Sequence, residues 1–107
     1  MNIIAKTPQP PYYAVIFSSI RAENNDGYTE MANLMIELAH KQAGFWGVES
    51  ARNELGITVS YWKDLESIHN WKKQADHQMA QKQGQSKWYK KYKVRIARVE
   101  RDYGFEK

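Results

Sequence analysis

The amino-acid sequence predicts an α+β fold in which four strands and two helices follow one another in the order βαββαβ. Four segments are rich in aromatic and β-branched residues, which is typical of strands. Two other segments repeat their apolar residues at the spacing of a helix. Short groups of Gly, Asn, Asp and Ser separate these segments and indicate turns. Because 107 residues is an ordinary size for one domain, we assign residues 1–107 to a single domain.

The chain begins with an arm that leads into the first strand. The arm, residues 1–11, contains three prolines, which hold the backbone extended but cannot donate to a sheet. We therefore expect an extended N-terminal arm rather than a strand. The next segment, YYAVIFSSIR at residues 12–21, predicts the first strand.

A turn and an amphipathic helix follow. The sequence NNDG at residues 24–27 predicts the turn, and the Asp26 carboxylate is expected to cap the helix after it. The helix is predicted over residues 28–42, because four apolar residues recur there at i, i+3, i+4 and i+7. These residues are Met31, Leu34, Met35 and Leu38.

The second half of the chain supplies a hairpin and a second helix. Residues 45–52 (FWGVESAR) and 57–63 (ITVSYWK) predict two strands, and the short turn between them predicts an antiparallel pairing. The helix is predicted over residues 65–83 and is expected to end at residues 84–86, which include a glycine.

The last predicted strand, KVRIARVERDY at residues 93–103, follows a short turn or helical segment at residues 88–92. It completes the ferredoxin-like split βαβ arrangement with an antiparallel sheet. A sheet with helices on one side should show one polar face, yet the first three strands are apolar on both faces. A second copy of the chain would cover the extra apolar face most simply, so we expect a homodimer.

Composition narrows the class of protein. The chain has a formal net charge of +4. It contains no cysteine, and this absence excludes disulfides, a thiolate nucleophile and cysteine-based metal sites. No apolar run approaches the roughly 18 residues of a membrane helix, and the start of the chain lacks the pattern of a signal peptide. We therefore expect a cytoplasmic protein that does not enter a membrane.

Half of the 16 Lys and Arg residues lie from Lys87 onward, among interleaved aromatic residues. Such a segment could follow a phosphate backbone, although a solvated charged segment is the simpler interpretation. RNA-recognition domains share the βαββαβ order but carry an aromatic signature on the third strand. The sequence GITVSYWK lacks this signature, and AGFWGVES resembles it only faintly on the second strand. We expect no nucleic-acid partner.

The segment SYWKDLESIHNW, residues 60–71, carries a more specific pattern. It resembles the part of antibiotic-biosynthesis-monooxygenase (ABM) proteins in which a strand ends in Trp and an acidic helix bearing a second Trp follows. The resemblance extends as an order of elements from Tyr13 to Tyr103, and residues 76–105 look like an uncharacterised bacterial subgroup. Such membership implies a dimeric α+β barrel, a homodimer whose two sheets face each other. It also implies a ligand cavity between sheet and helices in each subunit.

The resemblance further implies a cofactor-independent monooxygenase of a small aromatic substrate, and we expect neither cofactor nor metal. This chemistry needs a dry pocket, stacking side chains and a base that deprotonates the substrate so that it can reduce dioxygen. On this interpretation Trp71 orients the substrate, His77 is the base, Gln81 or Tyr61 adds hydrogen bonds, and Trp88 walls the cavity. The alternative is a protein of the same fold that binds or senses a small aromatic or apolar ligand without turnover.

The direction of His77 depends on the course of its helix. On one continuous helix His77 lies about 180° from Ile68 and faces water. ABM proteins tend to break this helix after the Trp, and a break at residues 72–74 would turn His77 and Gln81 inward. We favour the break because Gln81 then reaches the pocket, although the sequence leaves both courses open.

Three other features of this segment have structural or negative interpretations. A Trp on an apolar helical face, such as Trp71, is more often part of the core, and Trp62 is expected to be structural. The two histidines His69 and His77 share no helical face and have no third ligand nearby, so we expect no metal site.

The haem-degrading branch of the family places an iron-ligating histidine ten residues after the helical Trp. Gln81 occupies that position here, and glutamine is a poor iron ligand beside imidazole. The same branch places an Asn on the first strand, where FSSIR, residues 17–21, has none. These two departures argue against haem degradation.

Overall fold

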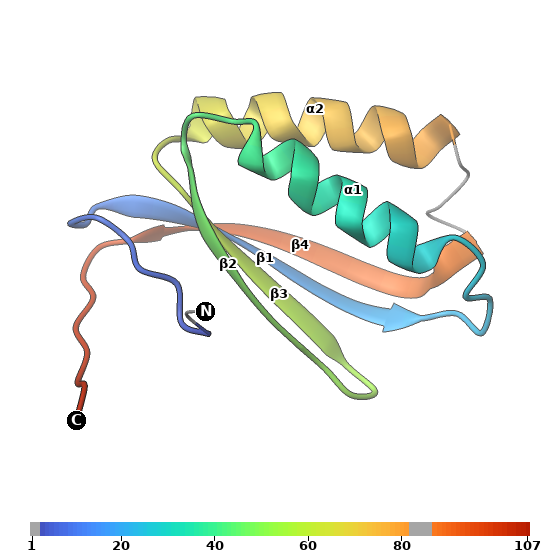
Figure 1. Ribbon diagram of the computed structural model, residues 1–107, viewed down its shortest axis with the longest axis horizontal. Helices are drawn as coiled ribbons and strands as arrows, with labels where there is room; N and C mark the ends of the chain where they lie inside the picture. Colours follow the sequence, from blue (N-terminus) through green and yellow to red (C-terminus); the bar gives the residue numbers. More distant parts are fainter. Residues whose placement is uncertain (1–2, 82–86) are drawn as a thin grey trace.

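The computed structural model describes residues 3–81 and 87–107 and confirms the predicted βαββαβ order. Its helices lie on the same side of a four-stranded antiparallel sheet (Figure 1). The sheet has the strand order β2-β3-β1-β4. The elements are β1 (Tyr12–Arg21), α1 (Tyr28–His40), β2 (Phe45–Arg52), β3 (Gly56–Trp62), α2 (Leu65–Gln81) and β4 (Tyr89–Val99).

Alternating side chains give the sheet two different faces, which we call the helix face and the open face. On the helix face, Val15 and Trp62 form the buried core with Ala39 of α1 and Ile68 of α2. The open face carries the intervening side chains, of which Tyr61 on β3 is one. In the described part of the chain, no helix is long and apolar enough to cross a membrane.

The segment before β1 packs against the open face near β2. The backbone N–H of Ala5 donates to the Glu49 carboxylate at 2.9 Å. Gly47, at a bulge of β2, has φ +149°, and a Cβ on it would lie 2.9 Å from the Cβ of Ala5. Glycine therefore permits both the backbone conformation and the close approach of this segment.

The turn before α1 differs from the prediction. Asp26 does not cap the helix: the N-cap residue is Gly27, with φ 77°, and no side chain caps the helix there. Instead, the Asn24 side chain accepts a hydrogen bond from the backbone N–H of Asp26 at 2.9 Å. The Asn side chain thus holds the turn, and the chain enters α1 through a left-handed glycine.

The predicted start of the last strand is also wrong. Strand β4 begins at Tyr89, four residues before the predicted start, because Tyr89 pairs with Arg21 at the end of β1. Strand β4 ends at Val99, four residues before the predicted end at Tyr103, and Val99 pairs with Tyr12 at the start of β1. The length of the partner strand, rather than local composition, sets both ends of β4.

Helix α2 runs without interruption from Leu65 to Gln81, so the predicted break at residues 72–74 is wrong. Lys72 and Asp76 form an ion pair of 2.7 Å across that stretch, at the i,i+4 spacing of a continuous helix. The predicted end of the helix, residues 82–83, and its stop at residues 84–86 lie outside the described residues.

Candidate functional site

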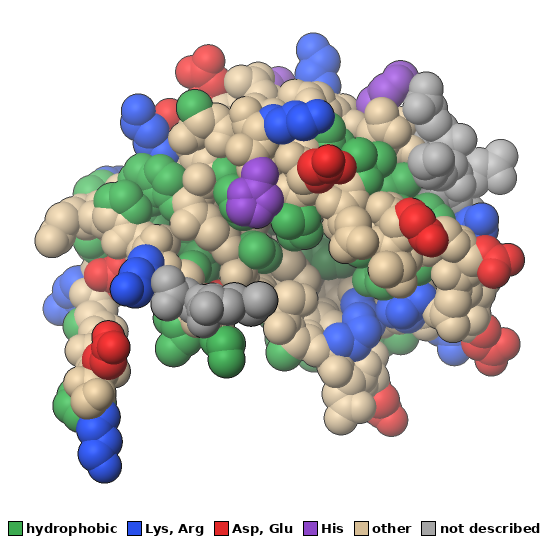
Figure 2. All heavy atoms as spheres, viewed as in Figure 1, with side chains coloured by type: hydrophobic (Ala, Val, Ile, Leu, Met, Phe, Trp, Pro, Cys, Tyr) green, Lys and Arg blue, Asp and Glu red, His purple; other side chains and the backbone are tan. Residues whose placement is uncertain are grey.

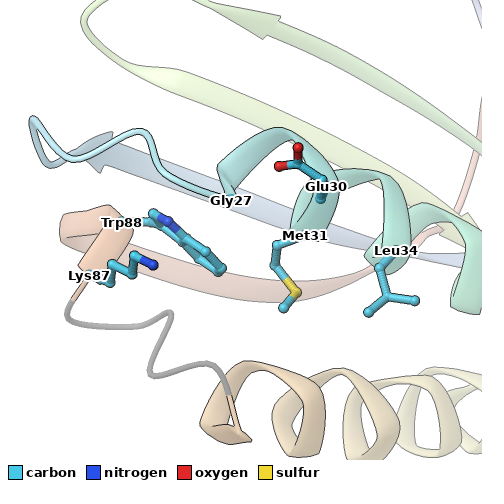
Figure 3. Close-up of a pocket in the computed structure, with 6 residues that line it drawn as sticks. All are labelled: Gly27, Glu30, Met31, Leu34, Lys87 and Trp88. Carbon is cyan, nitrogen blue, oxygen red and sulfur yellow. The ribbon is translucent and has the colours of Figure 1, made fainter.

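A cavity of about 580 Å³ opens between α1 and the short stretch that leads into β4 (Figure 3). It is lined by Gly27, Glu30, Met31, Leu34, Lys87 and Trp88. Figure 3 shows the Trp88 ring and the Met31 side chain directed into the same space. Because Met31 and Leu34 belong to the apolar stripe of α1, the amphipathic pattern of that helix supplies one wall of the cavity.

The Trp88 ring is held firmly in the cavity wall. It is 1% exposed, and its indole N–H donates to the Asp26 carbonyl at 2.7 Å. The backbone N–H of Ala22 donates to the Trp88 carbonyl at 2.8 Å, which ties the residue to the end of β1. Trp88 therefore lines this cavity, and its predicted role in holding a ligand stays a prediction.

Two charged side chains complete the cavity lining, and sequence reasoning missed both. Glu30 is an exposed residue in the first turn of α1. The Lys87 ammonium lies 5.5 Å from the centroid of the Trp88 ring, within reach of a cation–π interaction. No pattern in the sequence marked either residue, because the cavity forms only where α1 meets residues 87–88.

Trp71, predicted to orient the substrate, packs into the core. Its ring centroid lies 5.3 Å from that of Trp62, and its indole N–H donates to the Met35 carbonyl of α1 at 3.1 Å. The donor that was expected to reach a ligand is thus already bonded. Trp62 is fully buried, and its N–H donates to Ser60 Oγ at 2.8 Å, in agreement with the predicted structural role.

The other predicted residues do not gather around Trp88. His77 is exposed on the continuous helix α2, as the first of the two interpretations had it. Tyr61 lies on the open face, where its hydroxyl donates to Glu49 at 2.6 Å. Burial of the phenol is the larger cause that raises the pKa of Tyr61 above its usual range, and the hydrogen bond to Glu49 raises it further. Gln81 is the last residue of α2, and its side chain lies outside the described part of the structure.

The charged side chains do not suggest a metal centre. Within residues 3–81 and 87–107, no group of three or more His, Asp or Glu side chains is placed to hold a metal ion. Positive and negative side chains are interspersed over the face seen in Figure 2. The cavity beside Trp88 is lined mainly by apolar side chains, and its two charged residues are Glu30 and Lys87.

Comparison with known proteins places the chain in a family. Residues 11–83 match the family described as antibiotic biosynthesis monooxygenase. The chain belongs to this family. The match confirms the membership that residues 60–71 predicted, and it spans β1 to the end of α2.

The chain is also similar to individual proteins. The chain is 50% identical over 108 residues to the uncharacterised protein YqjZ of Bacillus subtilis (strain 168), covering 99% of this chain and 95% of the relative. Two solved structures have a similar fold at a TM-score of 0.65. PA3566 from Pseudomonas aeruginosa is 12% identical, with 91% of this chain and 100% of that one covered. NE2512, a protein of unknown function from Nitrosomonas europaea, is 9% identical, with 94% and 98% covered.

Proposed function

We propose that the protein is a cofactor-independent monooxygenase that oxidises a small aromatic substrate in the cavity beside Trp88. The observation that carries the proposal is the buried, hydrogen-bonded Trp88 ring, which forms an apolar wall with Met31 and Leu34. A volume of about 580 Å³ suits a small organic ligand, since such pockets commonly measure roughly 300–1,000 Å³. Membership of the monooxygenase family supports the reaction class.

The lining residues suggest a division of labour. Met31, Leu34 and Trp88 supply the apolar surroundings of the aromatic substrate, Glu30 accepts a proton from an activated CH₂ group, and Lys87 stabilises the oxyanion of the resulting enolate. The carbanion then reduces dioxygen. One oxygen atom becomes a new carbonyl on the substrate, and the other leaves as water with the two hydrogens of the CH₂ group. An anthrone oxidised to a quinone balances in this way without an external reductant.

Binding without turnover is the second candidate function. It is favoured by the exposure of Glu30, because a carboxylate in water is a weaker base than one in a dry pocket. The exposure of His77 on α2 also removes the base predicted from the sequence from the neighbourhood of Trp88.

Dioxygen uptake with an anthrone and a set of quinols tests the proposal. We expect substrate loss only in air, and a rate roughly tenfold or more lower in Glu30→Gln. Glu37→Gln, on the same helix and exposed, should leave the rate unchanged. Lys87→Gln should likewise lower the rate, whereas Lys90→Gln, an equal change of charge on β4, should not. Saturable anthrone binding with no uptake would leave only the second function, and no binding would contradict both.

We also propose that the protein is a homodimer formed through the open face. Ile20 and Ile57 remain 43% and 40% exposed there, which is unfavourable for two large aliphatic side chains in water. The segment after β4 exposes Tyr103 and Phe105 at 95% and 90%. This segment extends away from the sheet (Figure 1), and a second copy would offer its aromatic side chains a surface.

A further inference from the structure

A second cavity, of about 690 Å³, lies between the β1–α1 connection and the β2–β3 turn. Two arginines line it, Arg21 at the end of β1 and Arg52 at the end of β2. Asn25, Asn53 and the exposed carboxylates of Glu23 and Glu54 complete its polar lining. Neither the predicted site nor the proposed monooxygenase reaction uses any of these groups.

The Arg52 side chain is held against the helix face of the sheet. Its guanidinium donates to the carbonyl of Ser19 at 3.4 Å and also to the Ser19 hydroxyl. It lies over Gly56, where a Cβ would overlap the guanidinium group. Ser19 is 1% exposed, so the exposed Arg52 side chain is bonded to a buried partner.

The Arg21 side chain is held in a different way. Its guanidinium carbon lies 3.5 Å from the centroid of the Tyr28 ring, and one of its terminal nitrogens donates to the Asn25 side chain. Its Nε–H is buried and has no hydrogen-bond partner. A buried donor without an acceptor is unfavourable, and an acceptor atom from a ligand would satisfy it.

The two arginines share the cavity with Glu23 and Glu54 but, among the described residues, form no direct ion pair with a carboxylate. Across the described ranges, the ion pairs are Lys72–Asp76 and Arg98–Glu100, so neither cavity arginine is paired with a carboxylate. Burial and a hydrogen bond with Tyr28 raise the pKa of Tyr89, and the charges of Arg52 and Arg21 oppose that shift. Both arginines line the same cavity.

We propose that Arg21 and Arg52 form a binding site for a small oxyanion, either the carboxylate of an organic acid or a phosphate group. The planar guanidinium presents paired N–H donors that match the oxygens of both groups. Stacking on Tyr28 and bonding to Ser19 already restrict the two side chains, which lowers the entropic cost of binding. The site does not rest on the proposed oxygenase activity, because it lies in a different cavity.

Calorimetric titration with inorganic phosphate and with benzoate tests the site, in a low-salt buffer that contains neither anion class. We expect saturable binding of one anion per chain, weakened roughly tenfold or more in Arg21→Gln and in Arg52→Gln. Arg95→Gln removes an equal charge from an exposed position on β4 and should bind like the unaltered protein. Binding of phosphate alone, or of benzoate alone, identifies which oxyanion the site accepts.

Failure of the unaltered protein to bind either anion would overturn the proposal, as would equal weakening in Arg95→Gln. If the glutamine variants do not fold, Arg21→Lys and Arg52→Lys keep the charge while removing the paired donors. Folded lysine variants with weaker binding would support the site, and unchanged binding would overturn it. A loss of thermal stability in the variants without anion binding by the unaltered protein would show that the arginines only brace the loops.

Discussion

Two tryptophans of this chain both bond their indole N–H to a backbone carbonyl, but their rings lie in different surroundings. Trp71 and Trp88 both donate the indole N–H to a backbone carbonyl, one within α1 and the other just before it. The Trp71 ring packs against Trp62, whereas the Trp88 ring forms the wall of a cavity. We therefore expect substitutions of Trp71 to affect stability and substitutions around Trp88 to affect ligand binding.

A substitution of Trp71 checks its assignment to the core. Trp71→Phe keeps most of the apolar ring but loses the bond to the Met35 carbonyl, which should cost about 1 kcal/mol of unfolding free energy. His77→Ala, an exposed position six residues along α2, should change that free energy by less than about 0.5 kcal/mol. Denaturant unfolding measures both. A neutral Trp71→Phe with a costly His77→Ala would reverse our assignment of the two residues.

For single residues, the sequence predicted the directions of some side chains and not of others. Periodicity alone indicated that on a continuous helix His77 lies opposite Ile68 and faces water, and the structure agrees, with Ile68 buried and His77 exposed. The break was favoured because Gln81 would then reach the pocket, and it was wrong because α2 runs without interruption from Leu65 to Gln81. The direction of Trp88 could not be predicted, since it depends on a hydrogen bond to a turn 62 residues earlier.

At the scale of elements, α2 owes its clear start to Asp64. The Asp64 carboxylate accepts a hydrogen bond from the backbone N–H of Ser67 at 2.8 Å, as an N-cap residue does. Hydrogen bonds from the Ser67 side chain and backbone lower the pKa of Asp64. A lowered pKa means that the charged form stabilises the fold above the ordinary pKa of the group, and that this stability is lost as the pH falls through the lowered value.

Substitution of the cap tests this account of α2. Asp64→Ala should lower the melting temperature at neutral pH, and Asp64→Asn should lower it less, because an amide oxygen can still accept the bond. The difference between the unaltered protein and Asp64→Asn should shrink in acid, where the carboxylate becomes protonated. Thermal unfolding from pH 7 down to pH 3 measures it. A difference that persists undiminished in acid would rule out the charge as the source of the effect.

The strands show a similar division between local and long-range information. The bounds of β1 and β2 were predicted from composition, because aromatic and β-branched residues mark them locally. The start of β4 was missed, because YKKY at residues 89–92 is polar and becomes a strand only through pairing with β1. Tertiary pairing thus overrides the weak local preference of that segment.

At the scale of the whole molecule, the open face predicts self-association. Sedimentation at micromolar concentration should give twice the mass of one chain, because Ile20 and Ile57 would be buried between two sheets. Ile57→Lys should shift the protein toward the monomer by placing a charge in that interface, whereas Leu65→Lys, at an exposed position on α2, should not. A monomeric unaltered protein at this concentration would contradict the proposed dimer.

The family and the order of elements could be predicted from the sequence, but the position of the cavity beside Trp88 could not. Its walls come from α1 and from residues 87–88, which meet only when the chain folds. Four of the five residues predicted for the site lie on α2 and β3. Of these, Trp71 packs into the core, His77 is exposed to solvent and Tyr61 lies on the open face. Local motifs identified the family, and the packing of distant segments determined the cavity.

The most direct test of the account is a crystal structure of the protein soaked with an anthrone under anaerobic conditions. The account predicts that the ligand lies against the Trp88 ring, between Met31 and Leu34, with its oxygen toward Lys87. Density for the anthrone on the open face, or beside Arg21 and Arg52, with the Trp88 cavity empty, would contradict the central claim that this cavity is the functional site.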